Sequence, residues 1–311
     1  MKIIVHSYPS AEENLAYEEW LFHAFDETIL RLWINPRSVV VGKHQNAMAE
    51  ANVPYCIQEG ISVVRRISGG GTVYHDPGNI NFSFFRPVDA EKMIDYERNL
   101  VLIQQALTTL GYPVAMNARH DLFLNAHKVS GNAQHLRRGR ALHHGTILYD
   151  ADRVTLGKAI KRSLGNYQDK SVKSVRSPIA NLRSHLDLGT TEEFLTALAG
   201  ALRVQAMEIF EAPTPSREEL EALIDLRYSQ EEWNYGYSPT FTMERSTELF
   251  SAFVEVERGG ELRKFEVQST SSSVSIVGQP TRFFPTDILG WTQKQAGLSD
   301  AQKDMLRSTL L

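Results

Sequence analysis

Three consecutive glycines at positions 69–71 stand between segments with strand character, and they constrain the fold more than any other feature of the chain. Residues 61–64 are mostly β-branched, and the segments 72–74 and 80–84 alternate as strands do. Consecutive glycines lose backbone entropy on folding and add nothing to a core, so they persist where the chain must approach another group closely or adopt positive φ. We expect this tract to approach an anion or a flat ligand.

The position of the glycines excludes two familiar phosphate-binding motifs. No GxGxxG opens a helix here, and no GxxxxGK[ST] is present. Arg65 and Arg66 precede the tract, and the planar donors of arginine suit a phosphate or a carboxylate. A glycine-rich hairpin beside an arginine ion pair is the alternative, because glycine-rich turns are common.

Composition places the chain among soluble globular proteins with one large or two smaller domains, since 42% of its 311 residues are hydrophobic and 23% are charged. The single cysteine, Cys56, excludes a disulfide framework and a cysteine-based metal cluster, and it fits a reducing, cytoplasmic compartment. No His or acid adjoins Cys56 in VPYCIQEG, which favours a structural cysteine over a nucleophile. No apolar run reaches the roughly 18 residues of a membrane-spanning helix, and no signal-peptide pattern is found.

Charge is distributed unevenly although the formal net charge is only −4. Between Lys128 and Arg183, 12 Lys and Arg stand against three Asp, which gives this segment a net charge of +9. It favours an electropositive face that suits nucleotide phosphates or an acidic protein surface. Nucleic acid is disfavoured, because the pI is about 6.2 and no helix-turn-helix, zinc-finger or RNA-binding signature is present.

Periodicity predicts an α+β (mixed α/β) fold in which a sheet is flanked by helices. The predicted helices are 11–26, 95–110, 156–163, 191–210, 216–228 and 299–311. The predicted strands include a hairpin of 28–33 and 38–42 about Asn35-Pro36, then 121–124, 128–133 and 142–149, a second hairpin of 250–257 and 262–267 about Gly259-Gly260, and 274–277. We expect a catalytic domain at 1–242 and a small α+β accessory domain at 243–311.

A second group of polar residues lies around Lys128, which precedes Gly131 on a predicted strand. Asp121 can bind a divalent cation or pair with the amine. His143 and His144 are adjacent on a strand, so they point to opposite faces and at most one faces a site. Without a third ligand at metal spacing, a zinc site is not expected.

A lysine, arginines and a glycine loop suit the attack of a carboxylate on an α-phosphate. This reaction needs fixed cations and backbone N–H groups around the phosphorus, with magnesium on the departing pyrophosphate. It needs no side-chain nucleophile, which agrees with the lack of a convincing Ser-His-Asp or Cys-His arrangement.

Five motifs in order resemble lipoate-protein ligase A over roughly residues 1–240. They are RRISGGGTVYHDPGNINFSF (65–84), HDLFLNAHKVSGNAQ (120–134), LHHGTIL (142–148), KSVRSPIANL (173–182) and EEWNYG (231–236), with LRLWINPRSVVVGKHQN (30–46) in addition. The resemblance implies a fold like that of class II aminoacyl-tRNA synthetases and biotin ligases, and the C-terminal piece has the size of the family's accessory domain.

The resemblance also implies a two-step reaction. Lipoate and ATP with Mg²⁺ give lipoyl-AMP, and the lipoyl group then moves to a specific lysine of a lipoyl domain in 2-oxoacid dehydrogenase E2 subunits or in the glycine cleavage H protein. ATP and Mg²⁺ are co-substrates, no tightly bound cofactor is expected, and the protein is expected to be a monomer that binds neither nucleic acid nor membrane.

Matching each motif to the family assigns roles to individual residues. Lys128 is the catalytic residue and contacts both the lipoyl carbonyl and the adenylate phosphate. The implied nucleotide-binding residues are Arg66, Gly71, Thr72, Val73, Tyr74, Lys128, Ser174, Val175 and Arg176. The implied lipoate-binding residues are Trp33, Ser68, Gly69, Gly70, His75, Lys128, Gly131 and His144. Asp121 is the magnesium candidate, and the loop 174–176 is expected to close over the adenylate.

The sequence departs from the family in two places. His120 replaces the usual Asn before Asp121, and 125–127 reads Asn-Ala-His where a basic Arg is frequent. These departures concern metal and phosphate contacts, not the reaction class.

Four rival functions are open to the same fold or pocket. An octanoyltransferase of one branch needs a cysteine near the HDL motif, and none lies at 116–124. A lipoyltransferase that takes preformed lipoyl-AMP resembles the ligase almost throughout. A biotin ligase should have a different Gly-Arg loop, and a non-catalytic lipoate binder has less use for Lys128. The sequence leaves the choice between lipoate and octanoate open.

Overall fold

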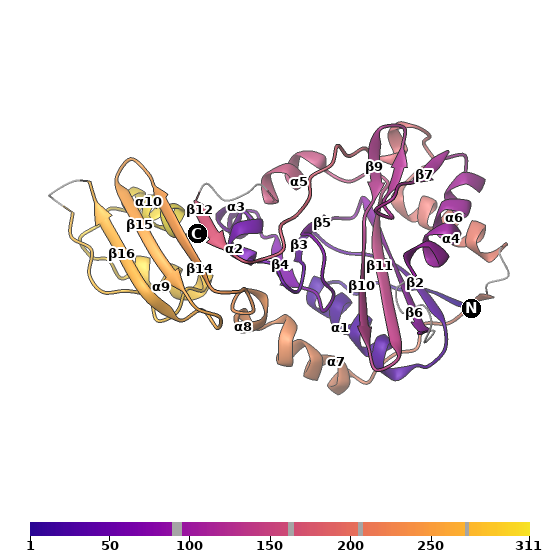
Figure 1. Cartoon of the computed structure of the whole chain (residues 1–311), viewed down its shortest axis with the longest axis horizontal. Coiled ribbons are helices and arrows are strands. Elements are labelled where there is room, and N and C mark those ends of the chain that lie inside the picture. The colour runs from indigo at the N-terminus through magenta and orange to yellow at the C-terminus, as the bar shows by residue number, and fades with distance from the viewer. Residues whose placement is uncertain (89–94, 161–164, 205–207, 271–273) are drawn as a thin grey trace.

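The computed structural model describes residues 1–88, 95–160, 165–204, 208–270 and 274–311. Figure 1 shows two lobes side by side along the long axis of the molecule. The larger lobe, on the right, carries the N-terminus and the longest strands, and the smaller lobe lies on the left. Sheets with helices packed against them confirm the predicted α+β class.

The larger lobe is built on a six-stranded sheet with the order β10-β11-β6-β2-β1-β13. Its strands are β1 (Lys2–Val5), β2 (Ile29–Ile34), β6 (Asn79–Pro87), β10 (Asn132–Arg137), β11 (Arg140–Leu148) and β13 (Glu208–Ile209). β1 runs parallel to β2 and β13, and the other neighbours are antiparallel. Because side chains alternate along a strand, Leu30 and Leu32 enter one core while Arg31 and Trp33 share the opposite face.

Two amphipathic helices, α4 (Tyr96–Thr109) and α6 (Thr191–Arg203), cover one face of this sheet. Leu100 and Ile103 of α4 are buried in one cluster with Phe82 and Phe84 of β6. The helix predicted at 95–110 is confirmed. The helix predicted at 191–210 is too long, because 208–209 pair with β1 as strand β13, and 205–207 lie outside the described residues.

The opposite face carries α1 (Ala11–Ala24) and a three-stranded sheet with the order β4-β3-β5. Its strands are β4 (Ser62–Arg65), β3 (Ser38–Val41) and β5 (Val73–His75). A capping box between Ser10 and Glu13 fixes the start of α1, and the predicted helix is confirmed.

The predicted hairpin of 28–33 and 38–42 is wrong, because β2 pairs in the large sheet and β3 pairs in the small one. Both strands are buried along almost their whole length. Each therefore needs cover on two faces, and the turn at Asn35-Pro36 carries the chain from one layer to the next.

A further three-stranded sheet, β7-β8-β9, carries the stretch that contains Asp121 and Lys128. Its strands are β7 (Val114–Met116), β8 (Leu122–Leu124) and β9 (His127–Ser130). Short helical segments complete the larger lobe: α2 (Ala47–Glu50), α3 (Val53–Gln58), α5 (Arg153–Ala159), the 3₁₀ turn Leu182–Ser184, α7 (Arg217–Leu223), the π-helical turn Ile224–Tyr228 and α8 (Glu231–Asn234). The helix predicted at 216–228 is confirmed as α7 with its π-helical turn. The one predicted at 156–163 starts earlier, after the cap Asp152, and its last predicted residues lie outside the described ranges.

The smaller lobe holds a four-stranded sheet with the order β12-β14-β15-β16, and two helices. These elements are β12 (Asn166–Asp169), β14 (Phe241–Ser246), β15 (Phe250–Val256), β16 (Leu262–Ser269), α9 (Pro285–Gln293) and α10 (Asp300–Leu310). The hairpin about Gly259-Gly260 and the final helix are confirmed. The strand predicted at 274–277 is wrong. The backbone N–H of Val277 donates a hydrogen bond to the side chain of Gln295, and its carbonyl accepts one from the indole of Trp291, so neither group pairs with a strand.

The two lobes share one apolar core. Val39 and Val41 of β3 and Cys56 of α3 lie in the same buried cluster as Val254 of β15 and Leu306 of α10. The edge strand β12 comes from the middle of the chain, and the expected boundary at 242/243 falls inside β14, so the division into two domains stays a prediction. Within the described ranges, every helix is too short or too polar to cross a bilayer.

Cys56 provides a test of this shared core, because it is the only cysteine in the chain and is 1% exposed. Burial raises the pKa of its thiol to about 12. We expect the native protein at pH 8 to resist an aromatic disulfide reagent, since the thiolate is the reactive form, and to release one equivalent of chromophore after unfolding in guanidinium. Rapid labelling of the folded protein would contradict a buried structural role.

Candidate active site

Two adjoining cavities of about 320 and 430 Å³ open beside the glycine tract. The first contains Trp33 and is called here the Trp33 arm, and the second contains Leu156 and is called the Leu156 arm. Seven residues line both arms: Thr72, Val73, Lys128, Gly131, Thr146, Ser174 and Val175. The arms therefore meet at Lys128.

Most residues predicted for the site line this cleft. Besides the shared ones, the Trp33 arm is lined by Trp33, Arg66, Gly70, Gly71, His75, Asp121 and His144, and the Leu156 arm by Tyr74 and Arg176. Ser68 and Gly69 do not line either arm, and Ser68 is fully buried behind the tract. The structure thus brings together segments that lie far apart in the sequence.

Lys128 is held at the junction from three directions. Its ammonium Nζ lies 2.8 Å from Oδ1 of Asp121, and its side chain is 22% exposed. Its backbone N–H donates to the carbonyl of Pro178 at 2.8 Å, which ties β9 to the motif at 173–182. A Cβ at Gly131 would lie 2.8 Å from Nζ, so only glycine leaves room for the ammonium in this position.

Arg66 braces the glycine tract from behind. Its guanidinium donates to the carbonyls of Gly69 at 2.6 Å and Gly71 at 2.7 Å, and to that of Val40 at 3.0 Å. Burial lowers the pKa of Arg66 to about 10, which leaves it charged at neutral pH. The expected direct contact of Arg66 with a phosphate stays a prediction, since these donors are engaged with main-chain carbonyls.

The backbone at Gly70 explains one glycine of the tract and also Gly42, which it approaches closely. Gly70 has φ of +86°, in the left-handed region that favours glycine. Its carbonyl oxygen would lie 2.1 Å from a Cβ placed on Gly42, so the two main chains are in direct contact.

The loop that contains Ser174 is docked on the tract through Gln45. The Ser174 hydroxyl accepts the backbone N–H of Thr72 at 2.9 Å and the side-chain N–H of Gln45 at 3.0 Å. The Gln45 carbonyl oxygen accepts the Thr72 hydroxyl at 2.8 Å. The loop therefore already lies against the cleft, where it was expected to close.

Arg65 points the other way and holds the EEWNYG motif. Its guanidinium donates to the carbonyls of Trp233 and Asn234, each at 2.8 Å, and to that of Gln45 at 2.8 Å. It also donates to the Ser238 hydroxyl at 3.0 Å. A single buried side chain thus links β4 to α8 and to the start of the smaller lobe.

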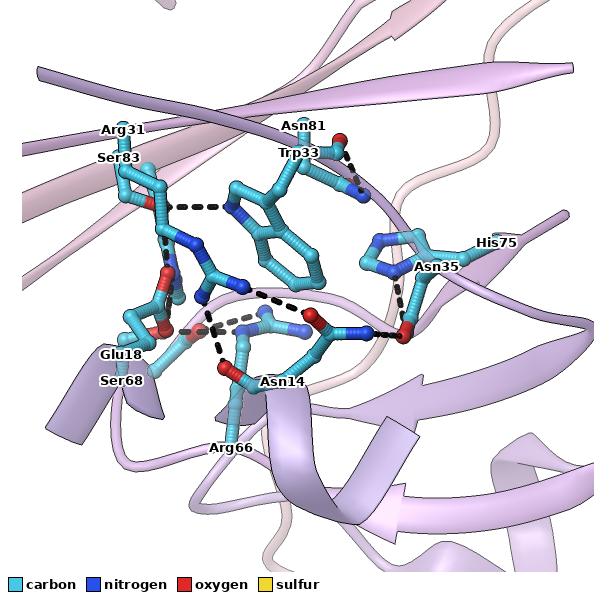
Figure 2. Close-up of polar contacts among 12 residues, drawn as sticks. Asn14, Glu18, Arg31, Trp33, Asn35, Arg66, Ser68, His75, Asn81 and Ser83 are labelled. Carbon is cyan, nitrogen blue, oxygen red and sulfur yellow. Dashed lines mark hydrogen bonds and ion pairs between the residues drawn. The ribbon is translucent and has the colours of Figure 1, made fainter. Parts of the chain in front are cut away.

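Figure 2 shows a buried polar network that includes Trp33 and His75, two residues that line the Trp33 arm. The guanidinium of Arg31 lies 4.5 Å from the ring centre of Trp33 and donates to Oδ1 of Asn14 at 2.7 Å. Asn14 donates to Asn35, and the amide of Asn35 lies 3.2 Å from Nδ1 of His75. These contacts fix the Trp33 and His75 side chains at the cavity.

The two adjacent histidines point to opposite faces of β11, as predicted. His143 lies with Phe82 and Phe84 on the side of α4 and contacts the Asn99 amide at 3.1 Å. His144 lines the Trp33 arm, and its Nδ1 lies 2.9 Å from a carboxylate oxygen of Glu18.

The sequence prediction missed several buried polar residues around the cleft: Asn14, Glu18, Arg31, Gln45 and Ser83. On α1, Asn14 and Glu18 are one helical turn apart and both are buried, so the helix buries polar as well as apolar positions. Arg31 did leave a signal, since a charge in the middle of the apolar strand ILRLWI must find a partner.

Comparisons with known proteins agree on one family. The family model described as the lipoyl protein ligase A/B catalytic domain matches residues 10–203. The lipoate-protein ligase LplJ of Bacillus subtilis is 35% identical over 240 residues, which cover 75% of this chain and 72% of that protein. The mitochondrial lipoyl amidotransferase LIPT1 of mouse is 35% identical over 243 residues, 75% of this chain and 64% of that protein.

Solved structures give the same result. A lipoate-protein ligase A bound with ATP matches with a TM-score of 0.65 at 27% identity, over 76% of this chain and 98% of that one. A bipartite lipoate protein ligase, studied with its E2 lipoyl domain from Thermoplasma acidophilum, matches with a TM-score of 0.65 at 26% identity, over 76% and 96% of the two chains.

The buried histidines generate a prediction about pH. Burial, with Arg66 and His144 nearby, lowers the pKa of His75 to about 3, and burial with His144 and Arg86 nearby does the same for His143. We expect imidazole NMR signals of both residues to show no titration between pH 5 and 8, whereas both titrate near 6.5 in urea.

The same shifts fix the sign of a stability change. Below pH 6.5 the unfolded chain binds protons that the folded chain does not, so the free energy of unfolding should fall as pH drops from about 6.5 towards 3 and should be unaffected by these groups above that range. A native midpoint near 6.5 for either histidine would contradict its burial.

Proposed function

The chain belongs to the lipoyl protein ligase A/B catalytic-domain family, and we propose that it is an ATP-dependent lipoate-protein ligase. The observation that carries this proposal is the position of Lys128, a cation at the junction of two cavities beside a rigid glycine tract. A residue at such a junction can contact both halves of an acyl-adenylate.

We assign the lipoyl chain to the Trp33 arm and the nucleotide to the Leu156 arm. Leu15, Trp33 and Val40 give the first arm an apolar wall for an eight-carbon acyl chain. In the second arm, the buried hydroxyl of Ser130 has no partner among the described residues, and a bound nucleotide can supply one.

Charge in the cleft supports a polyanionic substrate. The described lining contains six cationic side chains, Arg66, Arg119, Lys128, Arg153, Lys173 and Arg176, against two carboxylates, Glu50 and Asp121. Fixed cations around a transferring phosphoryl group stabilise the charge that develops there.

The first step forms a bond between a lipoate carboxylate oxygen and the α-phosphorus of ATP, and the bond from that phosphorus to the β-phosphate oxygen breaks. Lys128 neutralises charge on the α-phosphate and orients the attacking carboxylate. In the second step the neutral amine of the acceptor lysine attacks the acyl carbonyl, the C–O bond to AMP breaks, and the amine loses a proton to solvent. Lys128 then stays beside both the carbonyl and the departing phosphate.

Magnesium enters this account as part of the MgATP substrate. Mg²⁺ is usually bound by one or two carboxylates together with substrate phosphates. Asp121 is the one carboxylate that lines the Trp33 arm within the described residues. We propose that Asp121 exchanges its contact with Lys128 for one with magnesium when ATP binds.

We propose lipoyl domains of E2 subunits and the glycine cleavage H protein as acceptors. The Thermoplasma ligase was studied with an E2 lipoyl domain, and the cationic cleft of this chain suits an acidic partner. A monomeric state and a cytoplasmic location remain predictions, the latter supported by the free, buried Cys56.

A lipoyltransferase is the alternative function that one observation favours, because the mouse relative is named a lipoyl amidotransferase. Transfer from preformed lipoyl-AMP uses the same two arms. A ligase in addition needs room and positive charge for the departing pyrophosphate, which Arg119 and Lys173 provide at the Trp33 arm.

Exchange of labelled pyrophosphate into ATP separates these two functions. We expect exchange with lipoate and Mg²⁺ present and none when either is omitted, since lipoyl-AMP formation is reversible; octanoate in a parallel reaction measures the acyl preference. Lipoylation of an E2 lipoyl domain from lipoyl-AMP but never from lipoate and ATP would establish the transferase and refute the ligase.

Replacing the junction lysine tests its catalytic role. Lys128→Ala should lower both half-reactions about 100-fold or more, as the loss of a preorganised donor does, and should leave the circular dichroism spectrum unchanged. Lys158→Ala is the matched control, because Lys158 lies on α5 and lines neither arm. Normal rates in Lys128→Ala would remove Lys128 from the mechanism.

A further inference from the structure

A chain of hydrogen bonds runs from α1 to the back of the glycine tract. Glu18 is 1% exposed, and its carboxylate lies 2.9 and 3.0 Å from Nδ1 of His144. Nε2 of His144 lies 2.6 Å from the hydroxyl oxygen of Ser68, which accepts the Nε–H of Arg66 at 2.9 Å. Figure 2 shows Glu18 and Ser68 close together on one side of this network, with the Arg66 side chain reaching towards Ser68.

The hydrogen-bond partners of His144 favour one tautomer of its ring. The Ser68 oxygen accepts the Nε–H of Arg66, so with His144 neutral the Ser68 hydroxyl donates to Nε2 of His144, its acceptor among the described residues. His144 must then carry its hydrogen on Nδ1 and donate it to Glu18. The Glu18 carboxylate also accepts the Ser83 hydroxyl at 2.6 Å, which in turn accepts the indole N–H of Trp33 at 3.0 Å.

Ser68, His144 and Glu18 have the order of a hydrolase triad, but their surroundings exclude a nucleophilic serine. Ser68 is fully buried and lines neither arm of the cleft, so no carbonyl carbon can reach its oxygen. The bond from Arg66 further withdraws electron density from that oxygen. His144, in contrast, does line the Trp33 arm.

The negative charge of Glu18 balances the positive charge of two buried arginines, which a neutral side chain could not do. Arg31 is fully buried and Arg66 is 5% exposed, and their hydrogen bonds go to carbonyls, an amide oxygen and a hydroxyl instead of carboxylates. The negative charge of Glu18 stabilises the charged form of both guanidinium groups. Burial acts to raise the pKa of Glu18, but His144, Ser83 and Arg31 hold it below its ordinary value, so the carboxylate is ionised.

We infer that Glu18 is a positioning residue for acyl-adenylate formation, which acts through His144, Ser68 and Arg66 to hold the glycine tract in the shape that receives the acyl carboxylate. Arg66 transmits this effect because its other donors clamp the carbonyls of Gly69 and Gly71. Glu18 itself touches neither arm of the cleft. The role in acyl-adenylate formation rests on the proposed function. The hydrogen-bonded chain from Glu18 through His144 and Ser68 to Arg66, called here the relay, rests on geometry alone.

The test compares two neighbouring buried glutamates of α1. Glu18→Gln removes the charge and keeps the shape, and it should lower kcat of lipoate-dependent pyrophosphate exchange about 10- to 100-fold, the size expected for one buried charged hydrogen bond, with the KM for ATP unchanged. Glu19→Gln is the matched control, since Glu19 is 3% exposed but bonds Arg227 and Tyr228, away from the cleft. It should keep the wild-type kcat even where it lowers the melting temperature.

Two further measurements separate a relay from loss of stability. Nitrogen-15 NMR of His144 should show a single Nδ1–H tautomer in the wild type, and its Nδ1 signal should shift in Glu18→Gln, where a neutral amide oxygen replaces the carboxylate as acceptor. Ser68→Ala should lower kcat as Glu18→Gln does, and the double variant should fall no further than the worse single one, because both changes cut the same chain.

Four results would overturn the relay. A wild-type Nε2–H tautomer, a wild-type kcat in Glu18→Gln, an equal loss in Glu19→Gln or additive losses in the double variant each overturn the relay. If Glu18→Gln does not fold, the wild-type tautomer and the kcat of Ser68→Ala still decide. Absence of any exchange in the wild type refutes the proposed function, and the tautomer then tests the relay independently.

Discussion

The shape of the glycine tract depends on two buried guanidinium groups that face in opposite directions. Glycine alone permits this backbone but does not impose it, because an unbraced run of glycines has many conformations of similar free energy. Arg66 imposes the shape by donating to the carbonyls on either side of Gly70. Arg65 anchors the same strand to α8 through main-chain carbonyls. The glycines would allow many backbone conformations, but the two arginines hold the tract in one of them, as a preorganised site requires.

Other parts of the site are fixed by reference to this tract. The loop at Ser174 lies against it through Thr72 and Gln45, and the following Pro178 bonds the backbone of Lys128. Lys128 in turn pairs with Asp121, and Gly131 leaves room for its ammonium. Motifs that are more than 100 residues apart thus form one continuous wall, and the two arms of the cleft meet at a single cation.

The sequence predicted which residues gather at the cleft better than it predicted the path of the chain. Local chemistry was enough to single out the glycine tract and to suggest that Asp121 can pair with Lys128. Strand alternation was enough to place His143 and His144 on opposite faces. These features could therefore be found without a structure. The supposed hairpin of 28–33 and 38–42 could not be excluded, because periodicity shows that a strand is buried but not which sheet it joins. The pairing of β12 with β14 is equally non-local. Glu18 was missed because helical periodicity reports apolar positions, and its partner His144 lies 126 residues away.

We propose that one cleft holds an acyl-adenylate with Lys128 between its two halves. A crystal structure with a non-hydrolysable lipoyl-AMP analogue, in which a sulfamoyl group replaces the phosphate, tests it most directly. We expect the dithiolane chain against Trp33, the adenosine against Leu156, and the Lys128 ammonium within hydrogen-bond distance of both the acyl carbonyl and the sulfamoyl oxygen. An adenosine bound outside the Leu156 arm, or a Lys128 still paired only with Asp121, would refute this binding mode.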